Sequence, residues 1–374
     1  FLQTELVCLV AAAHLISTQP NRSTCAQQCD ISYHVPLFNL YVHTFVKVRI
    51  LRINQNSNTF FTSGPNPLPY FVQIVGNGDF ANVYQGKYHG STVCVKVFPA
   101  GWKTKFSAEK EVYELPLMKH VDGIVHFLGT GRKPDGNWLI VLQFAECGSL
   151  HSYLCKHTTN WELSLKLCTS LLQGAAYLHS DLHRHGLHKP PVAHRDLSSS
   201  NVLVRADGTC VLCDFGCSTI LRSCSGHRRW QSQTKNMKLG TLRYMSPEIL
   251  EGHVNLSNSL CLMQGDIYAL GLLLWEIWMR CSDLFEGGIA PKHILPYESE
   301  LGANVTLESL VQHVFHMDKR PSIPNHWETL PQGSVLQELM TDCWDWDPDA
   351  RLTAPCIVAR LDSLPLTFQP RYTS

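Results

Sequence analysis

Hydrophobic and polar residues alternate between residues 70 and 98 in a pattern typical of β-strands. The stretch FVQIVGNGDFANVYQGKYHGSTVCVKVF predicts two strands, a glycine-bearing turn between them and a third strand that ends at Lys96. The next segment, KFSAEKEVYELPLMKH, predicts a helix whose Val112, Leu115 and Leu117 pack on the sheet. A further apolar strand, WLIVLQF, leads to a Gly-Ser break and a new helix start.

The spacing of hydrophobic residues becomes helical after residue 160. In NWELSLKLCTSLLQGAAYLHSDL, the residues Leu163, Leu167, Leu171 and Leu178 share one face of a long amphipathic helix. We interpret this stripe as core and not as a cofactor site. A second long helix, DIYALGLLLWEIWMR, is expected to open at Asp266.

Residues 1–69 show a different pattern. Two apolar stretches, LVCLVAAAHLI and VPLFNLYVHTFV, have 11 and 12 residues, whereas a helix needs about 20 apolar residues to cross a bilayer. Residues 54–70, NQNSNTFFTSGPNPLPY, have the composition of a linker. We therefore expect residues 1–69 to be a poorly ordered leader or the remnant of an exported or membrane region, and folded structure to begin at residue 70.

Composition narrows the class of protein. With 374 residues, 44% of them hydrophobic, the chain can bury a sizeable core. Lys+Arg and Asp+Glu both total 31, so no net field favours a nucleic acid as partner, and none is expected. Twelve of the 15 cysteines are scattered from Cys94 to Cys356, mostly in apolar runs, which indicates free thiols that act as small hydrophobes.

The glycine-bearing turn is a candidate phosphate-binding loop. Gly76 and Gly78 allow the backbone to approach a triphosphate closely, and Ala81 holds a third small position. An ordinary hairpin with glycine at its turn is the alternative. The residues expected to bind the nucleotide are Val75, Gly76, Asn77, Gly78, Asp79, Phe80, Ala81, Val83, Lys96 and Leu142.

Lys96 and an acidic residue on the following helix form a candidate ion pair. Glu109 lies thirteen residues after Lys96 and is preferred to Glu111 on spacing. A buried lysine without such a partner would lose its charge. The pair would hold the lysine against the phosphates of the nucleotide.

Three further polar residues complete the candidate catalytic set. In VAHRDLSSSNVL, Asp196 can accept the proton of a substrate hydroxyl, and Asn201 offers an oxygen to a divalent metal ion. After a hairpin at RADG, the run CDFG supplies Asp214 as the second metal ligand. A lone DFG triplet arises by chance, whereas the ordered set from the glycine turn to Asp214 within about 140 residues does not.

Downstream segments predict supporting contacts. GTLRYMSPE, residues 240–248, would shape a platform for a peptide substrate, and Glu248 can bridge Arg351 of DPDARLTA. Asp266 would hold the backbone of the loop around Asp196 from below, or would act only as a helix N-cap.

With these residues in view, residues 70 to about 362 resemble the kinase domain of receptor serine/threonine kinases of the transforming growth factor-β family. HKPPVAHRD, GTLRYMSPE, PYESELGANVTLESLVQHVFHMDKRPSIPNHW and LMTDCWDWDPDARLTA carry the resemblance. A type I member would have a Ser/Gly-rich box before the kinase, which residues 54–70 lack, so the chain resembles the type II branch. HRDLSSSN and LSLKLCTSLLQGAAYLH are most similar to the anti-Müllerian hormone receptors.

The resemblance implies an α+β bilobal protein kinase fold with a small β-rich N-lobe and a large, mainly helical C-lobe. It implies residues 1–69 as a divergent segment and linker, residues 70–147 as the N-lobe, residues 148–362 as the C-lobe and residues 363–374 as a tail. The implied cofactors are ATP and Mg²⁺ or Mn²⁺, with catalytic residues Lys96, Glu109, Asp196, Asn201 and Asp214, of which Asn201 and Asp214 hold the metal.

One position departs from the kinase pattern. Serine/threonine kinases usually carry a lysine at the position of Ser198, and losing one charged donor to the transition state costs about 100- to 1,000-fold in rate. Ser198 therefore predicts a slow kinase. Tyrosine kinases place an arginine two or four residues after the aspartate, where this chain has Ser198 and Ser200, so the sequence does not favour tyrosine specificity.

Three functions are compatible with these features. The first is a kinase that phosphorylates Ser/Thr of a type I receptor, its substrate and heteromeric partner. The second is a nucleotide-binding pseudokinase that acts as a scaffold for the type I receptor, supported by Ser198 and Ala81. The third is a ligand-independent or dominant-negative receptor form.

The resemblance also implies a location. It places the kinase domain on the cytoplasmic side of a single-pass membrane receptor, whereas the short apolar runs of residues 1–69 leave a cytoplasmic location open. The anti-Müllerian hormone is expected as a ligand only if the complete protein has an ectodomain.

Overall fold

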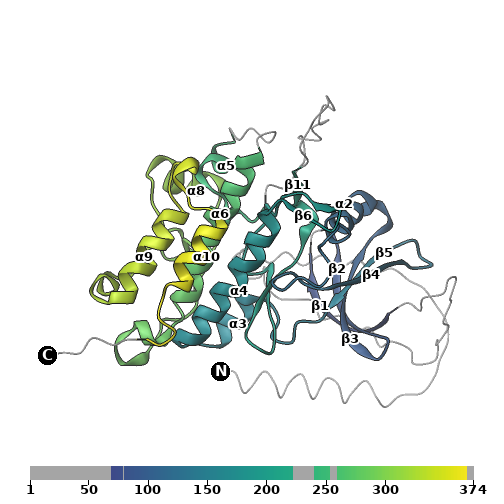
Figure 1. Ribbon diagram of the computed structural model, residues 1–374, viewed down its shortest axis with the longest axis horizontal. Helices are drawn as coiled ribbons and strands as arrows, with labels where there is room; N and C mark the ends of the chain where they lie inside the picture. The colour runs from purple at the N-terminus through teal and green to yellow at the C-terminus, as the bar shows by residue number, and fades with distance from the viewer. Residues whose placement is uncertain (1–68, 79, 222–239, 253–258, 369–374) are drawn as a thin grey trace, which may run out of the picture. The chain divides into compact units, whose positions relative to one another are not determined.

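The computed structural model describes residues 69–78, 80–221, 240–252 and 259–368. The expectations for residues 1–68 lie outside the described residues. The described residues belong to one compact unit of the chain, in which a sheet-rich lobe is followed by a helical lobe (Figure 1). This arrangement confirms the predicted bilobal α+β fold.

A five-stranded antiparallel sheet in the order β1-β2-β3-β5-β4 forms the N-terminal lobe. Side chains along β3 point alternately to the two faces of the sheet. Val93, Val95 and Val97 lie on one face and form a small core with Leu139 and Val141. The residues between them lie on the opposite face. The strands are β1 (Tyr70–Asn77), β2 (Asn82–Tyr88), β3 (Ser91–Phe98), β4 (Phe127–Arg132) and β5 (Trp138–Gln143).

Strand β3 continues past its predicted end at Lys96. Val97 pairs with Leu139, and Phe98 pairs with Trp138 of β5. The expected end was therefore wrong by two residues, because pairing with a neighbouring strand, and not the local pattern, ends β3.

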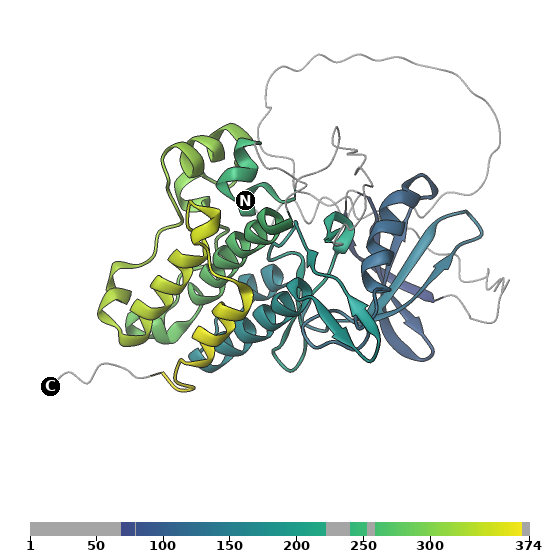
Figure 2. The same ribbon diagram turned by 45° about the horizontal axis from the view of Figure 1, so that its top comes forward.

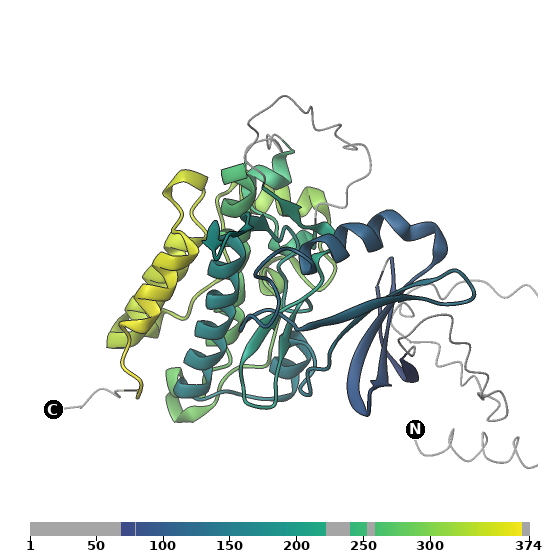
Figure 3. The ribbon, with the colours of Figure 1, turned by 45° about the vertical axis from the view of Figure 1, so that its right-hand side comes forward.

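Helix α2 (Lys103–Tyr113) lies across one face of the sheet (Figure 3). Its Phe106 ring stacks on Trp138 at a centroid distance of 5.1 Å. The predicted helix was too long, because Pro116 disfavours helical backbone at the residue before it. Leu115 is still buried, but Leu117 has a φ of 65° outside the helix and is partly exposed.

The helical lobe is built on two long helices, α4 and α6. Helix α10 packs along α4, and α9 packs along α6 (Figure 2). The helices of this lobe are α3 (Leu150–Lys156), α4 (Trp161–His179), α5 (Pro247–Glu251), α6 (Ser259–Trp278), α7 (Glu298–Leu301), α8 (Leu307–Leu310), α9 (Pro331–Cys343) and α10 (Ala354–Asp362).

Short elements connect the helices. The strand pairs are β6 (Leu182–Arg184) with β7 (Leu187–Lys189), β8 (Val192–Ala193) with β11 (Thr219–Ile220), and β9 (Val202–Val204) with β10 (Cys210–Leu212). The single turns are η1 (Ala100–Trp102), η2 (Phe215–Cys217), η3 (Leu242–Tyr244), η4 (Ser282–Leu284), η5 (Glu286–Gly288), η7 (Asn325–Thr329) and η8 (Pro348–Ala350), with a π-helical turn η6 (Val311–His316) after α8.

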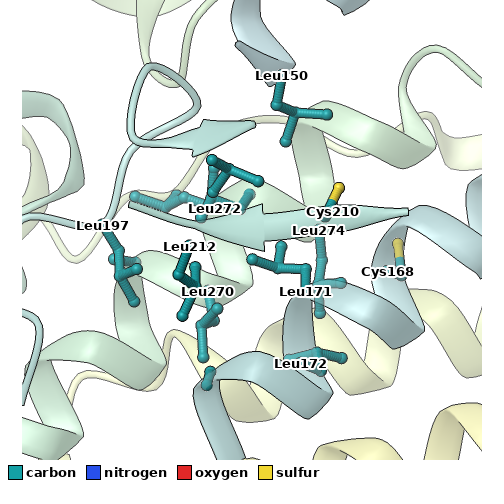
Figure 4. Packing of buried hydrophobic residues seen from close by; sticks show 14 of the residues in the cluster. Leu150, Cys168, Leu171, Leu172, Leu197, Cys210, Leu212, Leu270, Leu272 and Leu274 are labelled. Carbon is teal, nitrogen blue, oxygen red and sulfur yellow. The ribbon is translucent and has the colours of Figure 1, made fainter. Parts of the chain in front are cut away.

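The core of the helical lobe lies between α4, α6 and the β9–β10 hairpin (Figure 4). Leu171 of α4, Leu274 of α6 and Leu212 of β10 are all fully buried. The predicted apolar stripe of α4 is thus core, as expected, except that Leu163 is only partly buried. Packing in this core fixes the position of β10, which ends two residues before Asp214.

Helix α6 begins at Ser259 and not at Asp266, so the predicted helix start was wrong. Its segment Leu260–Trp278 is long and apolar enough to cross a membrane, but 78% of that window is buried inside the protein. The segment is therefore the central helix of the lobe's core. Asp266 consequently lies in the interior of a buried helix and is not an N-cap.

Two glycines set the distance between α4 and the segment before β4. A Cβ atom on Gly174 of α4 would lie 2.4 Å from the carbonyl oxygen of Gly123. Backbone atoms cannot yield as a flexible side chain can, so the close approach requires glycine here.

We predict that Gly174→Ala lowers the free energy of unfolding by about 1 to 3 kcal/mol, although the same change in a free helix stabilises it by about 1 kcal/mol. Urea unfolding monitored by circular dichroism measures the change. Gly101→Ala, where a Cβ would meet nothing within 4 Å, is the matched control and should be close to neutral. A stabilised Gly174→Ala variant would contradict the close approach.

Candidate active site

A buried lysine lies between two carboxylates at the junction of the lobes. The Lys96 Nζ atom lies 2.8 Å from Glu109 Oε2 of α2 and 2.7 Å from Asp214 Oδ1. Lys96 reaches this position because it lies on the β3 face opposite Val95 and Val97. The structure thus brings three of the five predicted catalytic residues into direct contact, and it pairs Lys96 with Glu109, the carboxylate preferred over Glu111.

Burial and charge act against each other in this cluster. Burial disfavours the ammonium of Lys96, but the attraction of Glu109 and Asp214 raises its pKa, so the lysine stays charged. Burial likewise opposes ionisation of Asp214, yet the charge of Lys96 lowers the pKa of that carboxyl. Glu109 is fully buried, and this desolvation raises its pKa to about 7. Lys96 and Asp214 are therefore ionised at neutral pH, whereas Glu109 is divided between its ionised and protonated forms.

A column of rings connects α2 to the loop that carries Asp196. Tyr113, one turn after Glu109, stacks on Phe127 at 5.3 Å and meets the edge of Phe215 at 5.0 Å. Phe215 in turn contacts the ring of His194 at 5.2 Å. Phe215 directly follows Asp214, so the column fixes the backbone that aims this carboxylate at Lys96.

Asp196 is held by the segment that begins at Gly240. Its Oδ1 atom accepts hydrogen bonds from the Thr241 N–H at 2.8 Å and the Thr241 hydroxyl at 2.9 Å. Gly240 has a φ of 99°, and a Cβ there would lie 2.6 Å from the Arg195 carbonyl oxygen, so only glycine permits the approach. Burial raises the pKa of Asp196, and the two Thr241 hydrogen bonds oppose that shift.

Asp266 anchors the same loop from below, as the sequence predicts. Its carboxylate accepts hydrogen bonds from the backbone N–H groups of His194 at 2.6 Å and Arg195 at 2.7 Å. Arg195 has a φ of 66°, a left-handed conformation that costs free energy for a residue other than glycine. The buried carboxylate offsets that cost and orients Asp196, the next residue.

Asn201 and Ser198 follow Asp196 on the same loop. The Asn201 side-chain amide donates to the Asp196 carbonyl oxygen at 2.8 Å, which leaves its own carbonyl oxygen for a ligand. Ser198 is buried, and among the described residues its hydroxyl has no hydrogen-bond partner.

Most of the predicted nucleotide-binding residues belong to β1, β2 and the turn between them. Gly76 pairs with Val83, and Asn77 with Asn82, across the β1–β2 turn, and the Gly78 N–H donates to the Ala81 carbonyl oxygen at 2.8 Å. Phe80 packs against Trp102 at 4.8 Å, on the α2 side of the turn. Val75 is exposed on β1, Ala81 is buried, and Asp79 lies outside the described residues.

Leu142, one of the residues expected to bind the nucleotide, lies on β5 where this strand pairs with β3. Leu142 is buried on β5, opposite Cys94 of β3. Cys94 lies two residues before Lys96, so the pleat puts both on one face. Burial raises the pKa of this thiol to about 11, so it stays protonated.

The helical lobe contains the predicted ion pair between Glu248 and Arg351. Arg351 donates from Nη1 to Glu248 Oε1 at 2.8 Å and from Nη2 to Glu248 Oε2 at 2.7 Å. This two-pronged geometry is the strong form of an arginine–carboxylate contact. It joins the GTLRYMSPE segment to the chain directly after η8.

Sequence reasoning missed Thr241, Tyr113, His194 and Cys94. The helical period puts Tyr113 on the face of Glu109, and the strand period puts Cys94 on the face of Lys96, so both signals were present. Thr241 and His194 carry no local signal, because their contacts join segments that are distant in the sequence.

Residues 70–361 match the family model described as protein tyrosine and serine/threonine kinase, so the chain belongs to this family. The chain is 42% identical over 316 residues to the anti-Müllerian hormone type-2 receptor of Oryctolagus cuniculus, covering 80% of this chain and 55% of that protein. It is 41% identical over 307 residues to the receptor of that name from Homo sapiens, covering 79% and 53%. It is 38% identical over 301 residues to the TGF-beta receptor type-2 of Rattus norvegicus, covering 78% and 52%.

These similarities confirm the resemblance to type II receptor kinases and, among them, to the anti-Müllerian hormone receptors. The chain spans about half the length of the curated relatives it matches.

The site's residues fit the ATP and divalent metal that this family uses. A Cβ on Gly76 would meet only Val83 at 3.7 Å, so the fold itself leaves room there and a phosphate could use it. Lys96 supplies a fixed positive charge, and the oxygens of Asn201 and Asp214 are the hard donors that such ions prefer.

The raised pKa of Glu109 predicts how the stability of the chain without nucleotide or metal depends on pH. Its folded pKa of about 7 exceeds the ordinary value of 4.5, so the folded state binds this proton more tightly than the unfolded state. The resulting stability is fully present below the ordinary value and is lost as pH rises through the folded value. Relative to Glu109→Gln, wild type should lose about 1 to 3 kcal/mol between about pH 5 and about pH 8.

Urea unfolding of both proteins across that pH range measures the difference. Glutamine has nearly the same shape as glutamate but does not ionise. The comparison therefore separates the effect of the charge from that of packing. A wild type that gains stability relative to Glu109→Gln as pH rises would show that Lys96 holds Glu109 ionised.

Proposed function

We propose that this chain carries the kinase domain of a receptor protein serine/threonine kinase that transfers the γ-phosphate of ATP to Ser or Thr of a type I receptor. The observation that carries the proposal is the cluster of Lys96, Glu109 and Asp214 facing a loop on which Asp196 and Asn201 are both oriented. The relatives' names support a proposed role in anti-Müllerian hormone or related signalling. The proposed location is a membrane receptor with its kinase domain in the cytoplasm.

Each residue has a proposed task. Lys96, held by Glu109, binds the phosphates, and the glycine turn closes over them. Asp196 has one oxygen fixed by Thr241, which orients the other to accept the proton of the substrate hydroxyl. Mg²⁺ or Mn²⁺ would be held by Asn201 and Asp214, and it supplies charge that offsets the phosphates.

Serine/threonine specificity follows from the same loop. The family model covers tyrosine kinases as well. Ser198 and Ser200 stand at the two positions where a tyrosine kinase has arginine, so we propose Ser and Thr as acceptors.

A second candidate function is a nucleotide-binding scaffold for the type I receptor. The buried hydroxyl of Ser198, which has no hydrogen-bond partner in the described part of the chain, favours it, since serine stands where serine/threonine kinases carry a cation. Lys96, Glu109 and Asp214 are in contact, and Asn201 holds the loop of Asp196, which favours the enzyme.

Transfer of radioactive phosphate from ATP to a catalytically inactive type I receptor cytoplasmic domain tests the proposal. We expect transfer by the purified chain with Mg²⁺ or Mn²⁺. Asp196→Asn removes the base and should lower the turnover number about 100- to 10,000-fold. Lys96→Arg should also abolish transfer, since the longer fork cannot occupy the same buried position. Nucleotide binding by wild type without transfer would favour the scaffold.

Ser198→Lys tests the cost of the missing cation. The variant should raise the turnover number at least about tenfold, because a charged donor would reach the transferred phosphate. Ser200→Lys is the matched control: it adds the same charge at an exposed position of the same loop and should change little. An equal gain in both variants, or none in Ser198→Lys, would contradict the assignment.

A further inference from the structure

A second cluster of reactive side chains lies outside the candidate active site. His151 and Cys155 are four residues apart on α3, so they share one helix face. His293, 138 residues after Cys155, comes from the segment between η5 and α7. One ligand atom from each of the three residues lies within 4.8 Å of the other two.

The distances are close to those of a metal site. The Cys155 Sγ atom lies 3.4 Å from His293 Nδ1 and 3.8 Å from His151 Nε2. A zinc ion with a Zn–S bond of about 2.3 Å and Zn–N bonds of about 2.0 to 2.1 Å requires roughly 3.4 to 3.6 Å between tetrahedral ligand atoms. The distance between Cys155 and His293 falls in this range, whereas Cys155 and His151 must move slightly closer. Histidine can ligate through either ring nitrogen.

The surroundings of His293 match those of a metal ligand. Its side chain is 3% exposed, and its Nε2 atom lies 2.8 Å from Oε2 of the fully buried Glu276. A carboxylate that accepts the proton of the second ring nitrogen fixes the tautomer in which the first nitrogen can bind a metal. Glu276 is itself held by the Tyr244 hydroxyl at 2.5 Å.

Charge and access also suit a divalent ion. The two charges of the ion would be offset by one thiolate and by the buried carboxylate of Glu276, which leaves no net charge in the site. Two other charged side chains near the thiol have their own contacts: Arg280 with the carbonyl oxygens of Leu154 and His157, and Glu298 with the Leu295 N–H. Cys155 is exposed, so an ion can enter from solvent.

We propose that His151, Cys155 and His293 form a zinc-binding site with three protein ligands and one position open to water. Binding displaces the thiol proton of Cys155 to solvent as the S–Zn bond forms, with no change of oxidation state. The ion would join α3 to the segment before α7 and so stabilise this side of the helical lobe.

Metal titration of the full chain, after removal of metal by a chelator, tests the proposal. Wild type should bind one more equivalent of Zn²⁺ than Cys155→Ala and should gain thermal stability from it, because the ion binds only the folded state. Co²⁺ as a probe should give a thiolate-to-cobalt charge-transfer band in wild type that is lost in Cys155→Ala.

Two control variants make the result specific. Cys356→Ala removes another exposed cysteine and should retain both the extra equivalent and the band. His188→Ala disrupts the exposed group of Asp181, His183 and His188 on the β6–β7 hairpin and should retain them too. Equal Zn²⁺ binding by wild type and Cys155→Ala, or loss of the extra equivalent in His188→Ala, would overturn the proposal. Because Cys155 is exposed, Cys155→Ala should have the same circular dichroism spectrum as wild type in the absence of metal.

Discussion

The need to neutralise one buried ammonium group organises this kinase. Lys96 lies among apolar strands, where an unpaired charge would be expelled or neutralised. Its two carboxylate partners come from α2 and from the segment after β10, so satisfying one charge positions three separate elements. The ring column through Tyr113 and Phe215 reinforces the same positions with apolar contacts.

A second buried charge, that of Asp266, fixes the position of a loop in the helical lobe. Asp266 sits inside α6, the most apolar of the long helices, and it is satisfied by two backbone N–H groups and His179. A carboxylate buried in this way stabilises only one conformation of the loop it binds. That conformation includes the left-handed Arg195 and presents Asp196 to Thr241. Rigid helices thus support a strained loop, as is common at functional sites.

Strands β1, β2, β3 and β5, helices α2, α4 and α6, and most of the candidate site could be predicted from local pattern. Period-two alternation in β3 identifies the face of Lys96, and the thirteen-residue interval points to Glu109. Element ends were less predictable: β3 ends where its pairing with β5 ends, α2 ends before Pro116, and α6 begins seven residues before Asp266. Each of these depends on a partner or on a backbone clash that hydrophobic periodicity does not record.

The sequence by itself determined the chemical groups, their order and their family, because glycine turns and the short motifs around Asp196 and Asp214 constrain chemistry within a few residues. Only the tertiary structure decided that Thr241 holds Asp196, that Asp266 binds the loop backbone and does not cap a helix, and that His293 meets His151 and Cys155. These contacts join residues separated by tens to more than a hundred positions. Their geometry is set by how the helices pack around the core, and local spacing along the chain carries no information about it.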